Sequence, residues 1–319
     1  MELRMTKRTA DIAIALVSAG WGSSYLLMKM GMEGMEPFTL LAWRFLLAFA
    51  LTLPLFWRRV RSADLKTVGQ SALLGFVMFI MLSLLITGLK TTTASTAGFL
   101  TSAMVVFVPI LQFAITKRKP SLAMTGGIVL TMGGIAMLTL RHSLSFESGS
   151  LLCLLGAFVY AVHILMTNRF TKLSDGLTLG VLQIGFIGLF GLIFGFLFET
   201  PTIPQGASQW TSVIGLAVIC SAFGFIMQTV AQKYTTPERI GVLFSLEPVF
   251  AGLFGFVFLG EILGIQGYVG ALLILGGVLV SGMKQAPARS MPRPPRLPGR
   301  SRRSAERVRA VEAESGTGA

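Results

Sequence analysis

Charged residues are scarce in this chain. Asp, Glu, Lys and Arg make up 13% of its 319 residues, whereas hydrophobic residues make up 53%. The usual charged share of a soluble domain is about 25%, so this composition and the mean hydropathy of +0.73 exclude an ordinary soluble protein. Cysteine is nearly absent. Cys153 and Cys220 both fall in apolar runs, which excludes a disulfide framework and a cysteine-based metal site.

The chain also lacks the residue clusters that several functions require. It has two histidines, no His-x-x-x-His pattern, no Asp-rich patch and no Gly-x-x-x-x-Gly-Lys-[Ser/Thr] segment. These absences disfavour a multi-pass membrane enzyme acting on lipid-linked substrates, and they disfavour an ATP-driven pump. We therefore expect no cofactor and no metal.

Long apolar runs are what the chain has in abundance. Each is about twenty residues long, enough for a helix to cross ~30 Å of hydrocarbon. Backbone groups in lipid must be paired within the segment, so these runs are helices. A cleaved signal peptide is disfavoured for the first run, because no small-residue cleavage site follows it. The sequence predicts an all-α integral membrane protein with ten transmembrane helices, near 10–30, 38–57, 67–89, 94–116, 122–140, 149–168, 176–198, 209–232, 238–260 and 264–283.

The positive charges predict the orientation. If the N-terminus is cytoplasmic, 23 Lys and Arg residues face the cytoplasm and only Lys90 and Arg141 lie in outer loops. Lys and Arg accumulate on the cytoplasmic side of membrane proteins, so both termini are expected there. This bias also accounts for the pI of about 10.4, and we expect no nucleic-acid partner.

One stretch occurs twice, 143 positions apart. Lys90–Gly134 and Lys233–Gly277 share thirteen identical residues over 45 aligned positions, among them Gly98/Gly241, Ser102/Ser245, Gly127/Gly270 and Gly134/Gly277. Five spans per half is an odd number, so the second half should be inverted relative to the first. Inverted repeats are typical of secondary transporters.

The repeat divides the chain into four parts. We expect a cytoplasmic N-terminus (1–9), a first five-helix repeat (10–140), an inverted second repeat (149–283) and a disordered basic tail (284–319). The tail either contacts anionic lipid head groups or only reinforces the topology. Glycines seven apart allow close helix packing, which leaves both a monomer and a homodimer open.

Glu247 is the most costly residue of the chain. It lies midway along the ninth predicted span, where a carboxylate costs about 2.5–3.5 kcal/mol or more. Pro248 removes a backbone hydrogen bond beside it. Glu247 either has a functional role, in which it exchanges a proton or pairs with a substrate ammonium, or is a protonated group that joins two helices.

Further polar residues complete the candidate set. Lys29 and Arg44 are intramembrane cations. They either gate or bind the solute, or form packing ion pairs with acids on the same side, namely Glu33, Glu36 and Glu261. Gln228 and Gln232 share a helical face, and these two residues and His163 could each bind a solute or only a neighbouring helix. Histidine titrates near neutral pH, so His163 could alternatively relay a proton. An amphipathic pocket could be lined by aromatic residues, which could equally be ordinary packing groups: Trp21, Tyr25, Tyr160, Phe223 and Phe225. The substrate and coupling candidates are Glu247, Lys29, Arg44, Gln228, Gln232, Trp21, Ser245 and His163, and the structural or gating candidates are Pro248, Pro109 and Glu261.

Several motifs resemble those of the drug/metabolite transporter superfamily, in particular its EamA-type ten-helix members. The resembling segments are Trp21-Gly22-Ser23-Ser24-Tyr25 with Lys29, Pro37 with Arg44-Phe45, Gln228 to Arg239, Ser245 to Phe250, and Leu259-Gly260-Glu261. The Leu-Gly-Glu end of the fourth helix is absent, since Ile115-Thr116-Lys117-Arg118 stands there. Only Glu261 is therefore carried over.

This resemblance implies a central cavity between inverted halves and, in many bacterial members, export of small metabolites. We expect a secondary transporter of the bacterial inner membrane that exports an amino acid or similar amphipathic solute by alternating access, with protons as a candidate coupling ion. The alternatives are a passive facilitator or channel, an importer of a small solute such as a sugar, and, remotely, a membrane enzyme.

Overall fold

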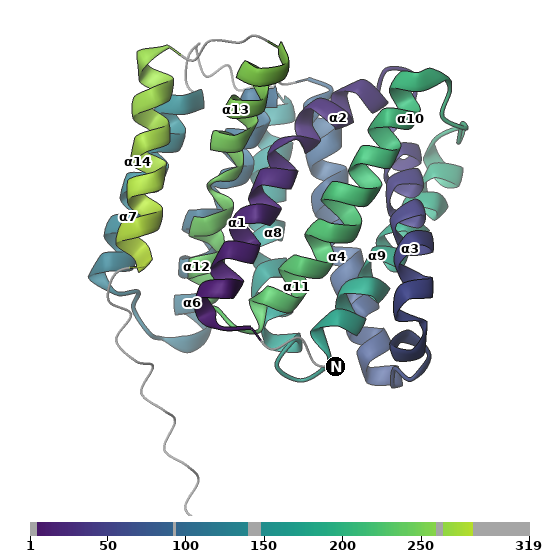
Figure 1. Cartoon of the computed structure of the whole chain (residues 1–319), viewed down its shortest axis with the longest axis horizontal. Coiled ribbons are helices and arrows are strands. Elements are labelled where there is room, and N and C mark those ends of the chain that lie inside the picture. Colours follow the sequence, from purple (N-terminus) through teal and green to yellow (C-terminus); the bar gives the residue numbers. More distant parts are fainter. Residues whose placement is uncertain (1–4, 92–93, 140–147, 260–263, 283–319) are drawn as a thin grey trace, which may run out of the picture. The chain divides into compact units, whose positions relative to one another are not determined.

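The computed structural model describes residues 5–91, 94–139, 148–259 and 264–282, and every regular element within these ranges is a helix (Figure 1). In chain order they are α1 (Lys7–Gly22), α2 (Ser24–Gly31), α3 (Pro37–Arg61), α4 (Leu65–Leu89), α5 (Ala94–Ser102), α6 (Met104–Thr116), α7 (Leu122–Thr139), α8 (Ser148–Phe170), α9 (Gly176–Phe198), α10 (Gly206–Gly215), η1 (Leu216–Phe225), α11 (Ile226–Gln232), α12 (Pro237–Phe244), α13 (Glu247–Leu259) and α14 (Ile265–Gly282).

The described helices group into ten segments that coincide with the ten predicted spans. Six segments stay single helices, and four are interrupted: α1–α2, α5–α6, α10–η1–α11 and α12–α13. Six segments are long and apolar enough to cross a membrane, and shorter apolar helical stretches occur at 100–116, 122–137 and 265–281. The predicted fold class, an all-α multi-pass membrane protein, is confirmed.

Two of the interruptions lie at equivalent positions of the repeat. The fourth segment breaks at Ala103 and the ninth at Ser245-Leu246, and position 103 corresponds to position 246. Just before each break a repeated serine bonds back to a repeated glycine carbonyl: Ser102 Oγ donates to Gly98 O at 2.8 Å and Ser245 Oγ to Gly241 O at 3.1 Å. Such back-bonding serines bend helices. The repeated Gly and Ser therefore mark the point where each segment splits into two half-helices.

Helices α7 and α14 pack against each other in opposite directions. A Cβ on Gly127 would lie 2.7 Å from the carbonyl oxygen of Gly277, and one on Gly134 would lie 2.5 Å from that of Gly270. The sequence repeat makes Gly127 equivalent to Gly270 and Gly134 equivalent to Gly277. Replacing each glycine by its equivalent therefore turns the Gly127–Gly277 contact into the Gly134–Gly270 contact. The last helices of the two predicted halves thus run antiparallel, as inverted repeats require.

Helices α3 and α9 form a second antiparallel pair, at the other edge of the helices in Figure 1. The glycines of α9 lie against the α3 backbone, since a Cβ on Gly188 would be 2.8 Å from Leu46 N and one on Gly191 would be 2.8 Å from Ala42 N. Small residues allow this close approach, which dispersion and packing favour in lipid.

Two aspartates cap helices at the same end of the bundle. Asp64 accepts from Thr67 N at the start of α4, and Asp175 accepts from Thr178 N at the start of α9. We call this end, where α1 also begins and α8 ends, the basal end, and the opposite end, where α2 ends and α10 begins, the distal end. The basal end is the predicted cytoplasmic side. The predicted tail (284–319) and Glu261 lie outside the described residues.

Candidate functional site

A small cavity of about 40 Å³ lies among the helices of both predicted repeats. The α1–α2 segment, α3, α4, α5, α8, η1 and α13 all contribute to it. It is lined by Trp21, Ser24, Tyr25, Met28, Arg44, Met78, Met81, Leu82, Leu85, Thr101, Tyr160, Phe225 and Glu247. Ligand pockets for drug-sized molecules are about 300–1,000 Å³, so this conformation is closed around its centre.

Glu247 is the first residue of α13, directly after the break in the ninth segment. It is 9% exposed, and its carboxyl group interacts with the buried Tyr25 hydroxyl. The N-terminus of a helix carries partial positive charge, which favours an acidic side chain there. Gly22 lets α1 approach this point, because a Cβ on it would lie 3.0 Å from Glu247 O and 2.8 Å from Phe250 Cβ.

Arg44 supplies the opposite charge from α3. It is 2% exposed, its Nε donates to Ser221 Oγ at 2.9 Å, and its guanidinium lies 4.8 Å from the centre of the Phe45 ring. Ser221 belongs to η1, a π-helical stretch of ten residues inside the eighth segment. Within the described part of the chain no carboxylate lies within ion-pair distance of Arg44. Arg44 and Glu247 therefore line one cavity without neutralising each other.

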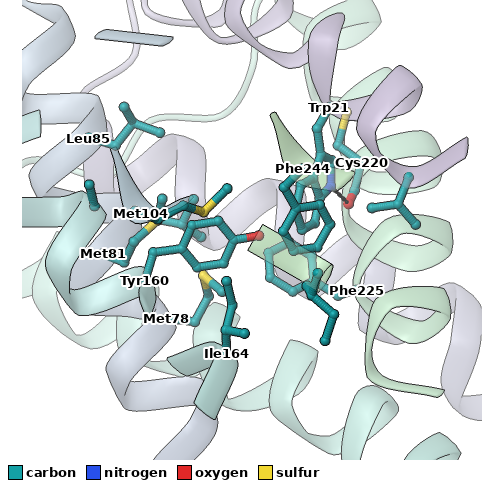
Figure 2. Packing of buried hydrophobic residues seen from close by; sticks show 14 of the residues in the cluster. Trp21, Met78, Met81, Leu85, Met104, Tyr160, Ile164, Cys220, Phe225 and Phe244 are labelled. Carbon is teal, nitrogen blue, oxygen red and sulfur yellow. Dashed lines mark hydrogen bonds between the residues drawn. The ribbon is translucent and has the colours of Figure 1, made fainter. Parts of the chain in front are cut away.

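An aromatic layer bounds this cavity on the basal side. The Trp21 ring lies 5.0 Å from Phe244 and 5.3 Å from Phe225, and Tyr160 stacks on Phe244 at 5.8 Å. Figure 2 shows the Tyr160 hydroxyl pointing toward the two phenylalanine rings. We call Trp21, Tyr160, Phe225 and Phe244 the aromatic layer.

Trp21 is held in this layer by the π-helical stretch. Its Nε1 donates to the Cys220 carbonyl oxygen at 2.8 Å, the dashed bond in Figure 2. Gly224, one turn further on, has no side chain to obstruct the ring, since a Cβ there would lie 2.5 Å from Trp21 Nε1. π-Helical insertions are frequent at functional sites, and here one insertion positions both Trp21 and, through Ser221, Arg44.

Polar side chains gather on the basal side of the aromatic layer. His163, Gln183, Gln228 and Gln232 are all fully buried there, on α8, α9 and α11. A polar pocket of about 530 Å³, here the basal pocket, opens beyond them at the basal end. It is lined by Arg59, Ser62, Ala63, Asp64, Thr67, Thr171, Lys172, Leu173, Ser174, Asp175, Thr178 and Lys233.

Several sequence candidates lie apart from the cavity. Lys29 is exposed, and Glu36, one of its expected partners, pairs with Lys90 instead. Ser245 is buried and bonds to Gly241 O, and Phe223 is 41% exposed. Pro109 lies within α6 and Pro248 in the first turn of α13. The described residues bring together no group of three His, Cys, Asp or Glu side chains.

The sequence did not single out Thr101, Ser221 or the methionines of α4 as cavity residues. Thr101 could have been found, because its equivalent position in the second copy of the repeat is Phe244, a residue of the aromatic layer. Ser221 carried no signal of its own, since its role depends on the π-helical stretch. The register also places Met104, 1% exposed, where the second half has Glu247. The carboxylate is therefore present in one half only.

Comparison with known proteins identifies relatives along almost the whole helical region. The model of the EamA-like transporter family matches residues 8–140 and again 147–283. An uncharacterized transporter of Archaeoglobus fulgidus is 30% identical over 275 residues, covering 86% of each chain. The uncharacterized transporter YcxC of Bacillus subtilis is 27% identical, over 86% of this chain and 93% of its own.

A solved crystal structure has the same fold. It superposes with a TM-score of 0.73 at 18% sequence identity, and covers 86% of this chain and 96% of its own. At this identity the likeness concerns the fold alone.

Proposed function

Because the chain belongs to the EamA-like transporter family, we propose that it exports a small zwitterionic metabolite, an amino acid or a similar amphipathic solute, by alternating access. The family makes it a transporter and a multi-pass membrane protein. The substrate class, direction, coupling and the bacterial inner membrane as its location are proposals. Export rests on the family resemblance and on the predicted cytoplasmic basal end.

One observation carries the substrate class: Arg44 and Glu247, whose side chains ionise with opposite sign, are both buried around one cavity and are not paired with each other. A buried charge without a partner is costly, so each side chain gains from a ligand of the opposite charge. A zwitterion offers both, its carboxylate to Arg44 and its ammonium to Glu247. Met28, Met78, Met81 and the aromatic layer give the rest of the solute an apolar environment.

Alternating access would move the aromatic layer. The cavity lies on the distal side of this layer, so a solute from the basal end reaches it only when Trp21 and Phe244 separate. Trp21 belongs to the first proposed repeat (10–140) and Phe244 to the second (149–283). A rocking movement of the two repeats would open the layer and close the distal side of the cavity.

Proton coupling would use Glu247. The carboxyl group cannot hold a proton and bind an ammonium at the same time, so the proton and the zwitterion would occupy it alternately. Tyr25 contacts the carboxyl group and would keep it oriented in both conditions. Release of the solute at the distal side would then accompany proton uptake there.

The test is transport of labelled amino acids into and out of proteoliposomes, with and without a pH gradient. Glu247→Gln and Arg44→Gln should each lower the rate at least about tenfold, the value of 1.4 kcal/mol of lost ion pairing. Glu247→Gln should also abolish the response to the pH gradient. Matched controls are the exposed Glu33→Gln and Lys29→Gln, which should keep wild-type rates.

Two results would contradict the proposal. Transport by Glu247→Gln at the wild-type rate and pH dependence would make Glu247 a purely structural group. Downhill transport that never responds to a pH gradient, in wild type and variant alike, would favour a passive facilitator.

A further inference from the structure

Most of the unpartnered polar atoms in the protein interior lie in one place. Nine buried side-chain N and O atoms of the described residues have no hydrogen-bond partner. Six of them belong to Tyr160 of the aromatic layer and to three residues between this layer and the basal pocket. They are Tyr160 Oη, His163 Nδ1, Gln228 Nε2 and Oε1, and Gln232 Nε2 and Oε1.

These four side chains share one helix interface. Tyr160 and His163 lie on α8 with ring centres 6.3 Å apart, and Gln228 of α11 neighbours Tyr160. One turn further along α11, the Gln232 carbonyl oxygen accepts from Asn168 Nδ2 of α8 at 2.7 Å. Gln228 and Gln232 are four residues apart and therefore occupy one face of α11.

The neighbouring polar groups are satisfied, which sets these glutamines apart. Gln183 Nε2 donates to Thr229 Oγ1 at 2.7 Å, and Gln183 Oε1 lies 3.4 Å from His163 Nε2. Gln228 and Gln232 are 0% exposed, yet neither end of either carboxamide makes a well-formed hydrogen bond, and the Tyr160 hydroxyl is the polar neighbour of Gln228. An unsatisfied buried polar group costs about 1–3 kcal/mol, which a purely structural residue would not retain twice on one face.

The interface also leads from the basal pocket to the aromatic layer. His163 and Thr167 of α8 and Thr171, directly after the end of α8, follow one another at intervals of four. All three are fully buried, and Thr171 lines the basal pocket. Asn168 closes this route, because its Nδ2 bonds to the carbonyl oxygens of Gln232 and Thr235 and its Oδ1 accepts from Lys172. A movement that breaks these bonds would expose the two glutamines to the basal pocket.

We infer that Gln228, Gln232 and His163 form a second binding station, on the basal side of the aromatic layer, for the uncharged hydrogen-bonding part of a solute. The inference rests on the proposed function for the identity of the solute. Carboxamides donate and accept, and none of these three residues is a carboxylate, ammonium or guanidinium, so the station takes a hydroxyl or carboxamide group and not an ion. The zwitterionic part would then pass the layer toward Arg44 and Glu247.

The transport test compares two groups of amino acids in proteoliposomes. The double variant Gln228→Met/Gln232→Met keeps side-chain length and removes the hydrogen bonds. It should slow serine and asparagine transport about tenfold, the worth of one or two hydrogen bonds, and change alanine and valine less than twofold. The inference would be overturned if the variant transported each of the four amino acids at the wild-type rate and had a higher unfolding temperature than the wild type.

A second measurement does not depend on knowing the substrate. Gln232→Cys in the full-length chain in membranes should react with a small water-soluble thiol reagent added at the basal side. Ile164→Cys, equally buried on α8, and the wild type with its buried Cys153 and Cys220 are the controls. Gln232→Cys no more reactive than these controls would overturn the station. Reactive Gln232→Cys without transport of any amino acid by the wild type would refute only the proposed zwitterionic substrate.

Discussion

At the scale of single residues, Trp21 and Gly22 are neighbours in the chain that pack at two different helix interfaces. Trp21 faces η1, where it bonds to Cys220 O and contacts Gly224, whereas Gly22 lies against the start of α13 at Glu247. These two adjacent residues therefore join α1 to both the eighth and the ninth segments. Trp21 and Gly22 thus hold the aromatic layer in place relative to the cavity that Glu247 lines.

Gly224→Ala tests this arrangement. The new methyl group would meet Trp21 Nε1, which must move and lose its bond to Cys220 O. We expect a loss of about 1–3 kcal/mol in the free energy of unfolding, as for other overpacked sites, and a leak of solute through the aromatic layer. Thermal unfolding in detergent and passive efflux from proteoliposomes measure the two effects.

Gly133→Ala is the matched control, because nothing lies within 4 Å of the added carbon. It should leave efflux unchanged and stabilise α7 by up to about 1 kcal/mol, the difference in helix propensity. An unchanged unfolding temperature in Gly224→Ala would contradict the close Trp21 contact.

The sequence located the polar side chains whose burial in a membrane span is costly, but it did not predict their hydrogen-bond partners. Glu247, Arg44, Gln228, Gln232 and His163 are all buried, because apolar runs admit polar residues only where lipid does not reach them. Lys29 is exposed although it lies in the same run as Trp21, since a long side chain near a helix end can reach solvent. The partner of Arg44 was not predictable, because Ser221 reaches it from a π-helical stretch.

Helices are the next scale, and their ends were harder to predict than their existence. Apolar length alone located all ten segments, but it gave no sign of the breaks at Ala103 and Ser23, where no proline occurs. The break before Glu247 had a signal in Pro248. A hydrogen-bond pattern that differs by one residue per turn, as in η1, leaves no trace in hydropathy.

Asp175 tests the capping of α9. Partial burial alone would raise the pKa of this carboxyl group, but hydrogen bonds from Thr178 and the charge of Arg59 outweigh burial, so the pKa lies below its ordinary value. A lowered folded-state pKa means that the stabilisation is present at neutral pH. It is lost as the pH falls below about 4, the ordinary aspartate value, through the lower folded one.

We expect Asp175→Ala to cost about 1 kcal/mol at neutral pH, the usual value of an N-cap. Asp175→Asn retains the cap bonds and should cost less, while removing this part of the acid dependence. Thermal unfolding between pH 3 and pH 7 distinguishes the two variants. Equal losses for both would assign the effect to the Arg59 ion pair (3.2 Å) and not to the cap.

At the scale of the whole molecule, the closed basal end depends on contacts between the proposed halves. Arg239 of α12 bonds to Asp11 of α1, and to Ser281 Oγ and the Val278 carbonyl oxygen of α14. Thr235 also donates to Asp11, at 3.2 Å. The two bonds to Asp11 join the proposed halves and must break before the basal end opens.

Asp11→Ala should therefore favour the state that is open at the basal end. We expect the thiol reactivity of Gln232→Cys to rise about tenfold in this background, since two or more hydrogen bonds are lost. Lys90→Gln, which removes an exposed ion pair elsewhere in the bundle, is the control and should leave the reactivity unchanged. Lower reactivity with Asp11→Ala would show that the contact does not hold the basal end closed.

The presence of Met104 where the other half has Glu247 has an electrical consequence. With a carboxylate in one half only, the proposed proton coupling would use one proton per cycle and not two. An exchange of one outgoing zwitterion for one incoming proton moves a single positive charge inward. The membrane voltage, worth about 2.3 kcal/mol per charge at 100 mV, would then drive export together with the pH gradient, and transport would appear as a measurable current.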